Sequence, residues 1–542
     1  MAGLSVLGMV AASCASNNAA SSGSGGAGGN ASGSGSGGAG SGGAGNGSGG
    51  AGGASATTGT GGNVSTDAGT DGASTDGNGS TGTGGAVGSG GNGGNGGNGG
   101  SKGSGGTTDA GSVDTHPITD AGGDSGGQVA ACPATGLGGA GQVRITKSGA
   151  TFAMTRDGAP YYIKGIAGGS NLVLAHDYGV NSTRTFGSDG AMGILDGAKS
   201  NCMTVLMGIG LSQTASDYTD PAFTNGKKAE VTNLLATIKN HPSLLMWALG
   251  NEINLGADTQ DAWTFVGQLA QMIHAQDPNH PVITVIAGAN VTAINHVVQW
   301  SPGIDAIGIN SYAAVVNVNN DIKPSTFTGP VIITEWGPTG HWESPITAWN
   351  RPIEETSGAK SRVYKTRYDS FAHTGRILGD YVFLWGQKIE RTPTWYGMFL
   401  ETNSNLGLMG ESLATVDTMS FEWSGAYPSN RAPDVTAFTL NGKVATDSVT
   451  LTSGQTVTTQ VTATDPDGDS LSFAWEILQD PEQPDLKGGP EDREPRVGAP
   501  VKGTSPMLSV KVPTQAGQYR IFVYALDGKG HGGTANIPFK VN

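Results

Sequence analysis

The chain has 542 residues, and its 29 lysine and arginine residues against 44 aspartate and glutamate residues give a formal net charge of −15. Such an acidic chain argues against nucleic acid as a partner, because phosphate binding needs a basic surface. Its 93 glycines exceed the usual share of about 7% more than twofold, so a large part of the chain cannot belong to an ordinary core.

The N-terminus begins with a short apolar run, residues 4–12, that ends in small residues directly before Cys14. This pattern resembles the lipobox of a bacterial lipoprotein. The resemblance implies that residues 1–14 are a signal segment and that Cys14 carries the lipid; the alternative is an uncleaved flexible end. We expect a location in the cell envelope, facing the surface or the periplasm, or secretion. Membrane contact is then expected only through the anchor.

Residues 15–135 are dominated by glycine, serine, alanine, asparagine and threonine. Such a segment has little apolar surface to bury against its conformational entropy, so we predict a disordered linker. No stretch of the chain reaches the ~18 consecutive apolar residues that a membrane span requires.

The chain has three cysteines: Cys14, Cys132 and Cys202. If Cys14 is lipidated, the other two are left as an even pair in an exported chain, and either a disulfide or two free thiols is compatible with that. No CxxC or HExxH motif and no histidine cluster occurs. We therefore predict no metal-dependent chemistry, no metal in the catalytic site and no cofactor.

The central region, residues 136–428, alternates short apolar runs with longer amphipathic stretches, which is typical of parallel strands joined by helices. Eight runs over this length predict a (β/α)₈ barrel. A doubly wound sheet is the alternative, but no GxGxxG follows the first run. The predicted strands are residues 161–165, 182–185, 204–208, 244–249, 282–286, 306–309, 331–334 and 381–384.

Two glutamates follow predicted strands at the barrel end where chemistry takes place. Glu252 comes after the fourth strand, in Gly250-Asn251-Glu252, and Glu335 comes after the seventh, in Glu335-Trp336-Gly337. Burial disfavours the charged form of a carboxyl group and costs free energy, so a glutamate directly after a buried strand is a candidate functional residue. Paired carboxylates are what glycosidic-bond cleavage needs.

These motifs resemble the clan A glycoside hydrolases, and the segment 247–252 is most similar to the family 2 catalytic barrel and to related β-1,3-glucan-modifying enzymes. The resemblance covers about residues 143–423. It implies that Glu252 is the acid/base, that Glu335 is the nucleophile and that Asn251 binds the sugar 2-hydroxyl. Retention of configuration through a glycosyl-enzyme would follow.

Three further residues match the same pattern. Arg184 lies in the strand-two segment whose arginine neighbours the nucleophile, where a guanidinium favours the ionised carboxylate. Tyr312 resembles the tyrosine that hydrogen-bonds the nucleophile, and Trp385 stands where the clan has an aromatic floor for the sugar. For each of the three, packing in the core or at the surface is the structural alternative.

Residues 429–542 change to alternating threonine, valine and serine, which predicts a small all-β sandwich. The loop Asp465-Pro466-Asp467-Gly468-Asp469 resembles loops of Ig-like modules appended to exported bacterial enzymes. Its carboxylates suit calcium, and an Asp/Gly turn without metal suits them equally. The module either binds glycan or spaces the catalytic domain.

Taken together, these patterns predict a monomeric retaining glycoside hydrolase that cleaves an extracellular β-linked polysaccharide, for example a β-glucan. Two alternatives remain open: a β-glucan transglycosylase, and a non-catalytic surface lipoprotein that binds glycan.

Overall fold

The computed structural model describes residues 130–480 and 491–542. The predicted signal segment, Cys14 and nearly all of the predicted linker lie outside the described residues. Those assignments stay predictions.

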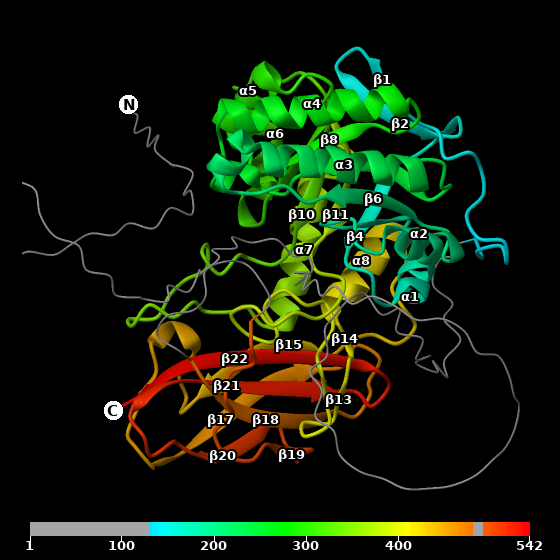
Figure 1. Ribbon diagram of the computed structural model, residues 1–542. Coiled ribbons are helices and arrows are strands. Elements are labelled where there is room, and N and C mark those ends of the chain that lie inside the picture. Colours follow the sequence, from blue (N-terminus) through cyan, green and yellow to red (C-terminus); the bar gives the residue numbers. More distant parts are fainter. Residues whose placement is uncertain (1–129, 481–490) are drawn as a thin grey trace, which may run out of the picture. The chain divides into compact units, whose positions relative to one another are not determined.

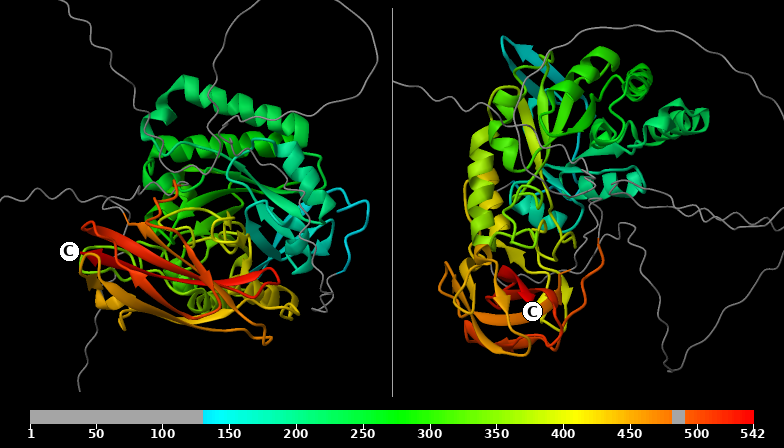
Figure 2. Two further views of the ribbon diagram at one scale, coloured as in Figure 1. Left: turned by 90° about the horizontal axis from the view of Figure 1, so that it is seen from below. Right: turned by 90° about the vertical axis from the view of Figure 1, so that its left-hand side faces the viewer.

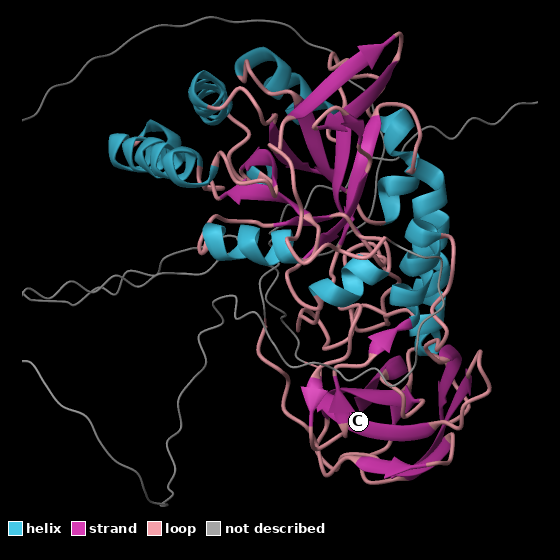
Figure 3. Ribbon diagram, turned by 90° about the vertical axis from the view of Figure 1, so that its right-hand side faces the viewer, coloured by secondary structure: helices cyan, strands magenta, loops and turns pink. Residues whose placement is uncertain are grey.

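Eight parallel strands close into a barrel in which each strand neighbours the next one along the chain. Figure 1 shows its strands in cyan to yellow-green, and in Figure 3 the helices lie outside them. The predicted (β/α)₈ barrel is therefore confirmed. Its strands are β4 (Ile163–Ala167), β5 (Ser182–Arg184), β6 (Thr204–Ile209), β7 (Leu244–Leu249), β8 (Val282–Ala287), β9 (Ala306–Asn310), β10 (Val331–Trp336) and β11 (Ile377–Val382).

The helices follow the strands around the barrel. Side-chain caps mark the starts of four of them, because Asp220, Thr259, Asn290 and Thr356 each accept a backbone N–H of the first turn. In the part of the chain that the structure describes, no helix is both long and apolar enough to cross a bilayer. The helices are α1 (Leu172–Asp177), α2 (Ala191–Ser200), α3 (Pro221–Ile238), α4 (Gln260–Gln276), α5 (Val291–Trp300), α6 (Val318–Asp321), α7 (Ser357–Phe371) and α8 (Ala414–Ser424).

The last barrel strand begins four residues before the predicted position, at Ile377 instead of Tyr381. Gly379 and Asp380 interrupt the apolar pattern there, although both are buried in the sheet. Burial raises the pKa of Asp380 to about 8, against the opposing effects of the Trp336 indole N–H and the Lys164 ammonium. A protonated aspartate is a neutral side chain, which explains how this strand tolerates it.

A small antiparallel sheet precedes the barrel and was not predicted. It consists of β1 (Val143–Ser148), β2 (Thr151–Arg156) and β3 (Ala159–Pro160). Val143 and Met154 pack with the inward-facing residues of the barrel strands. The Val143 N–H bonds the Asn279 carbonyl just before β8, so this sheet covers the N-terminal end of the barrel, opposite the end that carries the predicted site.

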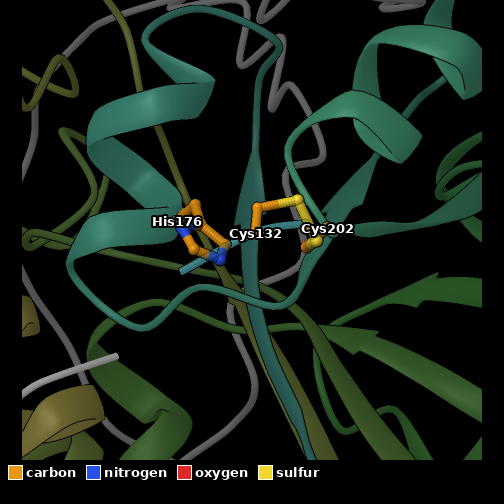
Figure 4. Close-up of side chains that lie close together, drawn as sticks. All are labelled: Cys132, His176 and Cys202. Atoms are coloured by element: carbon orange, nitrogen blue, oxygen red, sulfur yellow. A yellow bond between two sulfur atoms is a disulfide. The ribbon is translucent and has the colours of Figure 1, made fainter. Parts of the chain in front are cut away.

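Cys132 and Cys202 form a disulfide across 70 residues, which settles the choice between a disulfide and free thiols. The bond ties the segment before β1 to the turn between α2 and β6 (Figure 4). The His176 ring of α1 lies beside it, with one nitrogen within 4.8 Å of both sulfurs.

The C-terminal module, orange to red in Figure 2, is built mainly of strands in two sheets. In β17, residues 457, 459 and 461 are buried and their neighbours are exposed, which confirms the predicted alternation. One sheet has the order β14-β22-β21-β18-β19, with β16 paired to β22, and the other has the order β15-β17-β20. Their bounds are β14 (Ser412–Leu413), β15 (Asp434–Leu440), β16 (Thr450–Leu451), β17 (Thr456–Thr464), β18 (Ser472–Gln479), β19 (Val501–Gly503), β20 (Met507–Lys511), β21 (Gly517–Leu526) and β22 (His531–Val541). A short hairpin, β12 (Thr402–Asn403) and β13 (Leu408–Met409), precedes β14.

All described residues fall within one compact unit, and the barrel and the sandwich share buried contacts. The N-terminal half of α7 packs against β15 and β22 of the sandwich. The Ser357 hydroxyl at its start accepts the backbone N–H of Thr534 in β22 at 2.9 Å. The two folds are therefore joined through a helix of the barrel.

Candidate active site

The carboxyl ends of four barrel strands bring three predicted site residues together with Asn310, which was not predicted. Arg184 ends β5, Glu252 follows β7 after two residues, Asn310 ends β9 and Glu335 is the penultimate residue of β10. These ends meet because the strands are parallel and point the same way.

Glu335 is 6% exposed and is held from three sides. Its Oε1 accepts from Arg184 Nη1 at 2.9 Å and from Asn310 Nδ2 at 2.7 Å, while its Oε2 accepts from the Tyr312 hydroxyl at 3.1 Å. A guanidinium and two neutral donors favour a charged carboxylate. The arrangement therefore suits a carboxylate that acts as a nucleophile.

Asn310 also links the two glutamates to each other. Its Nδ2 lies 2.7 Å from Glu335 Oε1 and 3.0 Å from Glu252 Oε1. The two oxygens that share this nitrogen are at most about 5.7 Å apart, the sum of these two distances. The two carboxyl groups therefore lie close together, as the ~5–5.5 Å separation in retaining glycosidases requires. The geometry thus favours direct attack by one carboxylate.

Arg184 orients a third residue of the site. Its Nη2 donates to Asn251 Oδ1 at 2.6 Å, and Asn310 Nδ2 lies 3.1 Å from the same oxygen. The guanidinium also lies 4.5 Å from the centre of the Phe186 ring. With its oxygen occupied in this way, Asn251 is left its amide hydrogens to offer to a ligand.

The backbone at Glu252 is left-handed, with φ of 54°. Gly250, two residues earlier, has φ of 74°, and glycine adopts that conformation without strain whereas glutamate does not. The Glu252 N–H bonds the Val285 carbonyl of β8 at 3.0 Å, which fixes the turn. The chain accepts this local cost at a position that presents a half-buried carboxylate at the barrel end.

Tyr312 is buried, and that burial together with the charge of Glu335 raises its pKa well above the ordinary value. The phenol therefore stays protonated and can donate to Glu335 over the whole working pH range. Its ring makes edge contacts with Trp342, Phe383 and Tyr396 at centroid distances of 5.4, 6.1 and 5.8 Å. Trp342 is 47% exposed, so this aromatic wall is open to solvent on one side.

His341 supports the same wall. Its Nδ1 lies 2.9 Å from the Tyr396 hydroxyl, and its backbone N–H donates to that hydroxyl at 3.2 Å. Burial and the nearby Arg391 charge lower the pKa of His341 to about 4. The imidazole is therefore neutral at physiological pH and holds Tyr396 as a hydrogen-bond partner.

Trp385 does not join this group. Its side chain is fully buried and packs against Phe399 and Trp423 in the core between barrel and helices. Its role as a sugar floor stays a prediction, and its burial favours the packing alternative. Phe383, two residues earlier, is the aromatic side chain of this segment that touches Tyr312.

The structure thus brings together five of the predicted residues: Arg184, Asn251, Glu252, Tyr312 and Glu335. Their chemical roles stay predictions. Sequence reasoning missed Asn310 as a site residue, although an amide that ends an apolar strand two residues before Tyr312 was a usable signal.

The acidic loop of the sandwich has a structural use. Asp465 Oδ1 accepts the backbone N–H groups of Asp467 and Asp469 at 2.9 and 3.0 Å, and Lys529 Nζ lies 2.7 Å from Asp469 Oδ1. This is an aspartate-stabilised turn. One oxygen of each of the three carboxylates also lies within 4.8 Å of the others, so both alternatives from the sequence stay open.

Comparison with known proteins relates the barrel to a family. Residues 191–342 match the family model described as "Glycosyl hydrolases family 2, TIM barrel domain". The matched segment contains Asn251, Glu252, Asn310, Tyr312 and Glu335.

Two curated relatives are similar over part of their length. A β-galactosidase of Arthrobacter sp. (strain B7) is 24% identical over 342 residues, which is 53% of this chain and 32% of that protein. A β-glucuronidase of Paenibacillus borealis is 24% identical over 193 residues, 31% of this chain and 30% of that protein. The chain therefore spans about a third of the length of these curated relatives.

Among solved structures, a Bifidobacterium dentium β-glucuronidase complexed with coumarin-3-O-glucuronide superimposes with a TM-score of 0.39. Its sequence identity is 17%, over 52% of this chain and 49% of that one.

Proposed function

We propose that the chain is a retaining β-glycoside hydrolase that uses Glu335 as nucleophile and Glu252 as acid/base, on the premise that residues 191–342 match the TIM barrel domain of glycosyl hydrolase family 2. The observation that carries the proposal is the bridge from Asn310 Nδ2 to both carboxylates. It supports the short carboxyl separation that double displacement needs.

In the first step, Glu335 Oε attacks the anomeric carbon and forms an ester bond with it. The bond from that carbon to the leaving-group oxygen breaks, and the protonated Glu252 gives its proton to that oxygen. Arg184 and Tyr312, both bonded to Glu335, hold the carboxylate in the line of attack.

In the second step, Glu252 is the base. It takes a proton from water as the water oxygen attacks the anomeric carbon, and the ester bond to Glu335 breaks. The two inversions give net retention, and both glutamates return to their starting states. The role proposed for the Asn251 amide is to bind the sugar 2-hydroxyl, which the hydrogen bond from Arg184 to the Asn251 oxygen supports by fixing the orientation of the amide.

For the substrate, we propose a β-linked polysaccharide. The half-exposed Trp342 ring beside Tyr312 supports this, because an aromatic face offers sugar C–H groups a broad apolar contact. A site for an extended chain profits from such a platform next to the reacting sugar.

For the location, we propose export and anchoring through Cys14. The small-residue pattern before Cys14 supports this, as does the Cys132–Cys202 disulfide, which suits an oxidising compartment.

The testing experiment incubates the full chain and its Glu335→Ala variant with aryl β-glycosides and with β-glucan, mannan, galactan and xylan. Products from the wild type alone, with the β-anomer formed first by NMR, are the expected result. Removal of the nucleophile is expected to lower kcat at least about a thousandfold.

Two outcomes would contradict the proposal. An α-anomer formed first would exclude double displacement, and equal turnover by both proteins would remove Glu335 from the reaction. Products longer than the starting oligosaccharide would instead show transfer, the alternative in which a sugar hydroxyl replaces water in the second step.

A further inference from the structure

A buried charged network lies between the barrel loops and the sandwich. At its centre is Glu354, fully buried in the loop before α7. Its Oε1 accepts from Lys360 Nζ at 2.6 Å and from the Thr394 hydroxyl at 2.9 Å. Its Oε2 accepts from the Thr392 hydroxyl and from Asn536 Nδ2, both at 2.6 Å. Burial alone would raise the pKa of Glu354, but Lys360 and the other donors outweigh it, so the carboxylate stays charged.

The sandwich supplies one of these donors and holds it in place. Asn536 lies on β22, and its Oδ1 accepts from Arg520 Nη1 on β21 at 2.8 Å. Arg520 Nη2 donates to the Pro352 carbonyl of the barrel loop at 2.9 Å and to Asp480 Oδ2 at 3.0 Å. All of these side chains are buried, so each hydrogen bond fixes geometry in a low-dielectric setting.

From Glu354 the network continues to the aromatic wall of the site. Lys360 Nζ also donates to the carbonyls of Thr394 and Trp395, at 2.6 and 2.8 Å. The next residue is Tyr396, whose ring contacts that of Tyr312, the donor to Glu335 Oε2.

The described surface of the sandwich has no exposed aromatic ring on which a sugar could stack. Every aromatic residue between Asp434 and Asn542 is buried: Phe438, Phe473, Trp475, Tyr519, Phe522, Tyr524 and Phe539. An aromatic stacking platform is therefore absent from that part of the chain. This favours a supporting role for the module over glycan binding.

We propose that Asn536 and Arg520 are positioning residues for the active site: through Glu354 they fix the 392–396 segment and thereby the Tyr312–Glu335 hydrogen bond. The sandwich then completes the catalytic centre. The proposal rests on the proposed hydrolase function for its kinetic consequences and on the hydrogen-bond network alone for its structural ones.

A buried network that only stabilised the fold could be replaced by apolar residues of similar size without loss of function. The proposal instead requires that the groups facing Glu354 keep their hydrogen bonds. Asn536→Ala removes the donor from the sandwich side, and Thr392→Val removes one of the three donors from the barrel side, the one that shares Oε2 with Asn536. Thr392→Ser keeps the hydroxyl and tests rescue. Ile537→Ala, in the sandwich core next to Asn536, is the control for stability alone.

The kinetic arm measures kcat, KM and the pH–rate profile of full-length variants on the best aryl β-glycoside. Asn536→Ala and Thr392→Val are expected to lower kcat at least fivefold with KM changed less than twofold. The acid limb of their pH–rate profiles is expected to move to higher pH. When the hydrogen bond from Tyr312 weakens, the Glu335 carboxylate is protonated more readily. Thr392→Ser and Ile537→Ala are expected to keep the wild-type profile. Wild-type kcat and pH profile in Asn536→Ala would overturn the proposal.

The structural arm follows amide hydrogen exchange in peptides that cover residues 391–400. Asn536→Ala is expected to speed exchange there at least fivefold, without a change in β5 to β8, whereas Ile537→Ala is not. Equal exchange in Asn536→Ala and wild type would overturn the proposal. This arm does not depend on turnover, so an inactive wild type would refute the proposed function and still leave the positioning role to be decided here.

Discussion

Asn310 Nδ2 lies 2.7 Å from Glu335 Oε1, and the same nitrogen reaches Glu252 Oε1 at 3.0 Å. A single side-chain amide therefore sets the spacing of two groups that come from different strands. The carboxylates would repel each other at this distance, and the shared donor offsets part of that repulsion.

Asn310→Ala is expected to lower kcat about a hundredfold, because it removes a preorganised donor from the two carboxylates proposed to react. Asn310→Asp is expected to lower it further, since a third carboxylate would raise the proton affinity of both glutamates. Steady-state kinetics with an aryl glycoside measures both effects. Wild-type kcat in Asn310→Ala would show that the amide bridge has no part in the reaction.

Tyr312→Phe keeps the ring contacts with Trp342 and Tyr396 and removes only the hydroxyl. Hydrogen bonds to charged groups contribute about 1.5–3 kcal/mol, so kcat/KM is expected to fall roughly 10- to 150-fold with little change in melting temperature. Tyr396→Phe, which loses its bond to His341 and none to Glu335, is the matched control. Equal losses in the two variants would contradict a specific role for the Tyr312–Glu335 bond.

Most of the barrel could be predicted because its signals are local. A strand such as Leu244–Leu249 is an uninterrupted apolar run, and the polar residue that follows it lies at the functional end of any such barrel. The shifted start of β11 shows the limit. Gly379 and Asp380 look unlike residues of a buried strand, and only the folded protein shows that burial keeps the aspartate protonated, against the opposing effect of the Trp336 hydrogen bond.

The rest of the site depends on contacts that are distant in sequence. Asn536 and Glu354 are 182 residues apart, and nothing local in either segment marks them as partners. The position of Trp385 illustrates the same point, since its packing against Phe399 and Trp423 depends on two later segments.

Asp380 predicts a pH dependence of stability. Its ordinary pKa is 3.8, and the folded protein raises it to about 8. Between these pH values the folded chain keeps a proton that the unfolded chain has lost, so stability falls as pH rises from about 4 to about 8. In Asp380→Asn the amide keeps the acceptor for Trp336 but cannot ionise.

The melting temperature of Asp380→Asn is therefore expected to change less between pH 5 and pH 8 than that of the wild type, with a difference of several degrees. Asp196→Asn, at an exposed position, serves as the control. A parallel pH dependence in Asp380→Asn and wild type would be evidence against a protonated Asp380.

Removal of the Cys132–Cys202 disulfide is expected to lower the stability of the folded protein. Closing a loop of 70 residues lowers the entropy of the unfolded chain by an amount worth roughly 4 kcal/mol. The double variant Cys132→Ser/Cys202→Ser is expected to melt at a lower temperature, and its kcat at 25 °C is expected to be unchanged because the bond is not among the contacts of Glu335. An unchanged melting temperature would show that the loop is already ordered without the bond.

The left-handed backbone of Glu252 places catalysis and thermal stability in opposition at one position. A non-glycine residue in that conformation costs about 1–3 kcal/mol, and Glu252→Gly would recover part of it while removing the carboxyl group proposed as the proton donor. If variants of this chain were selected for heat resistance alone, substitutions at position 252 that abolish activity would therefore be favoured. Engineering for durability has to hold that residue fixed and gain stability elsewhere.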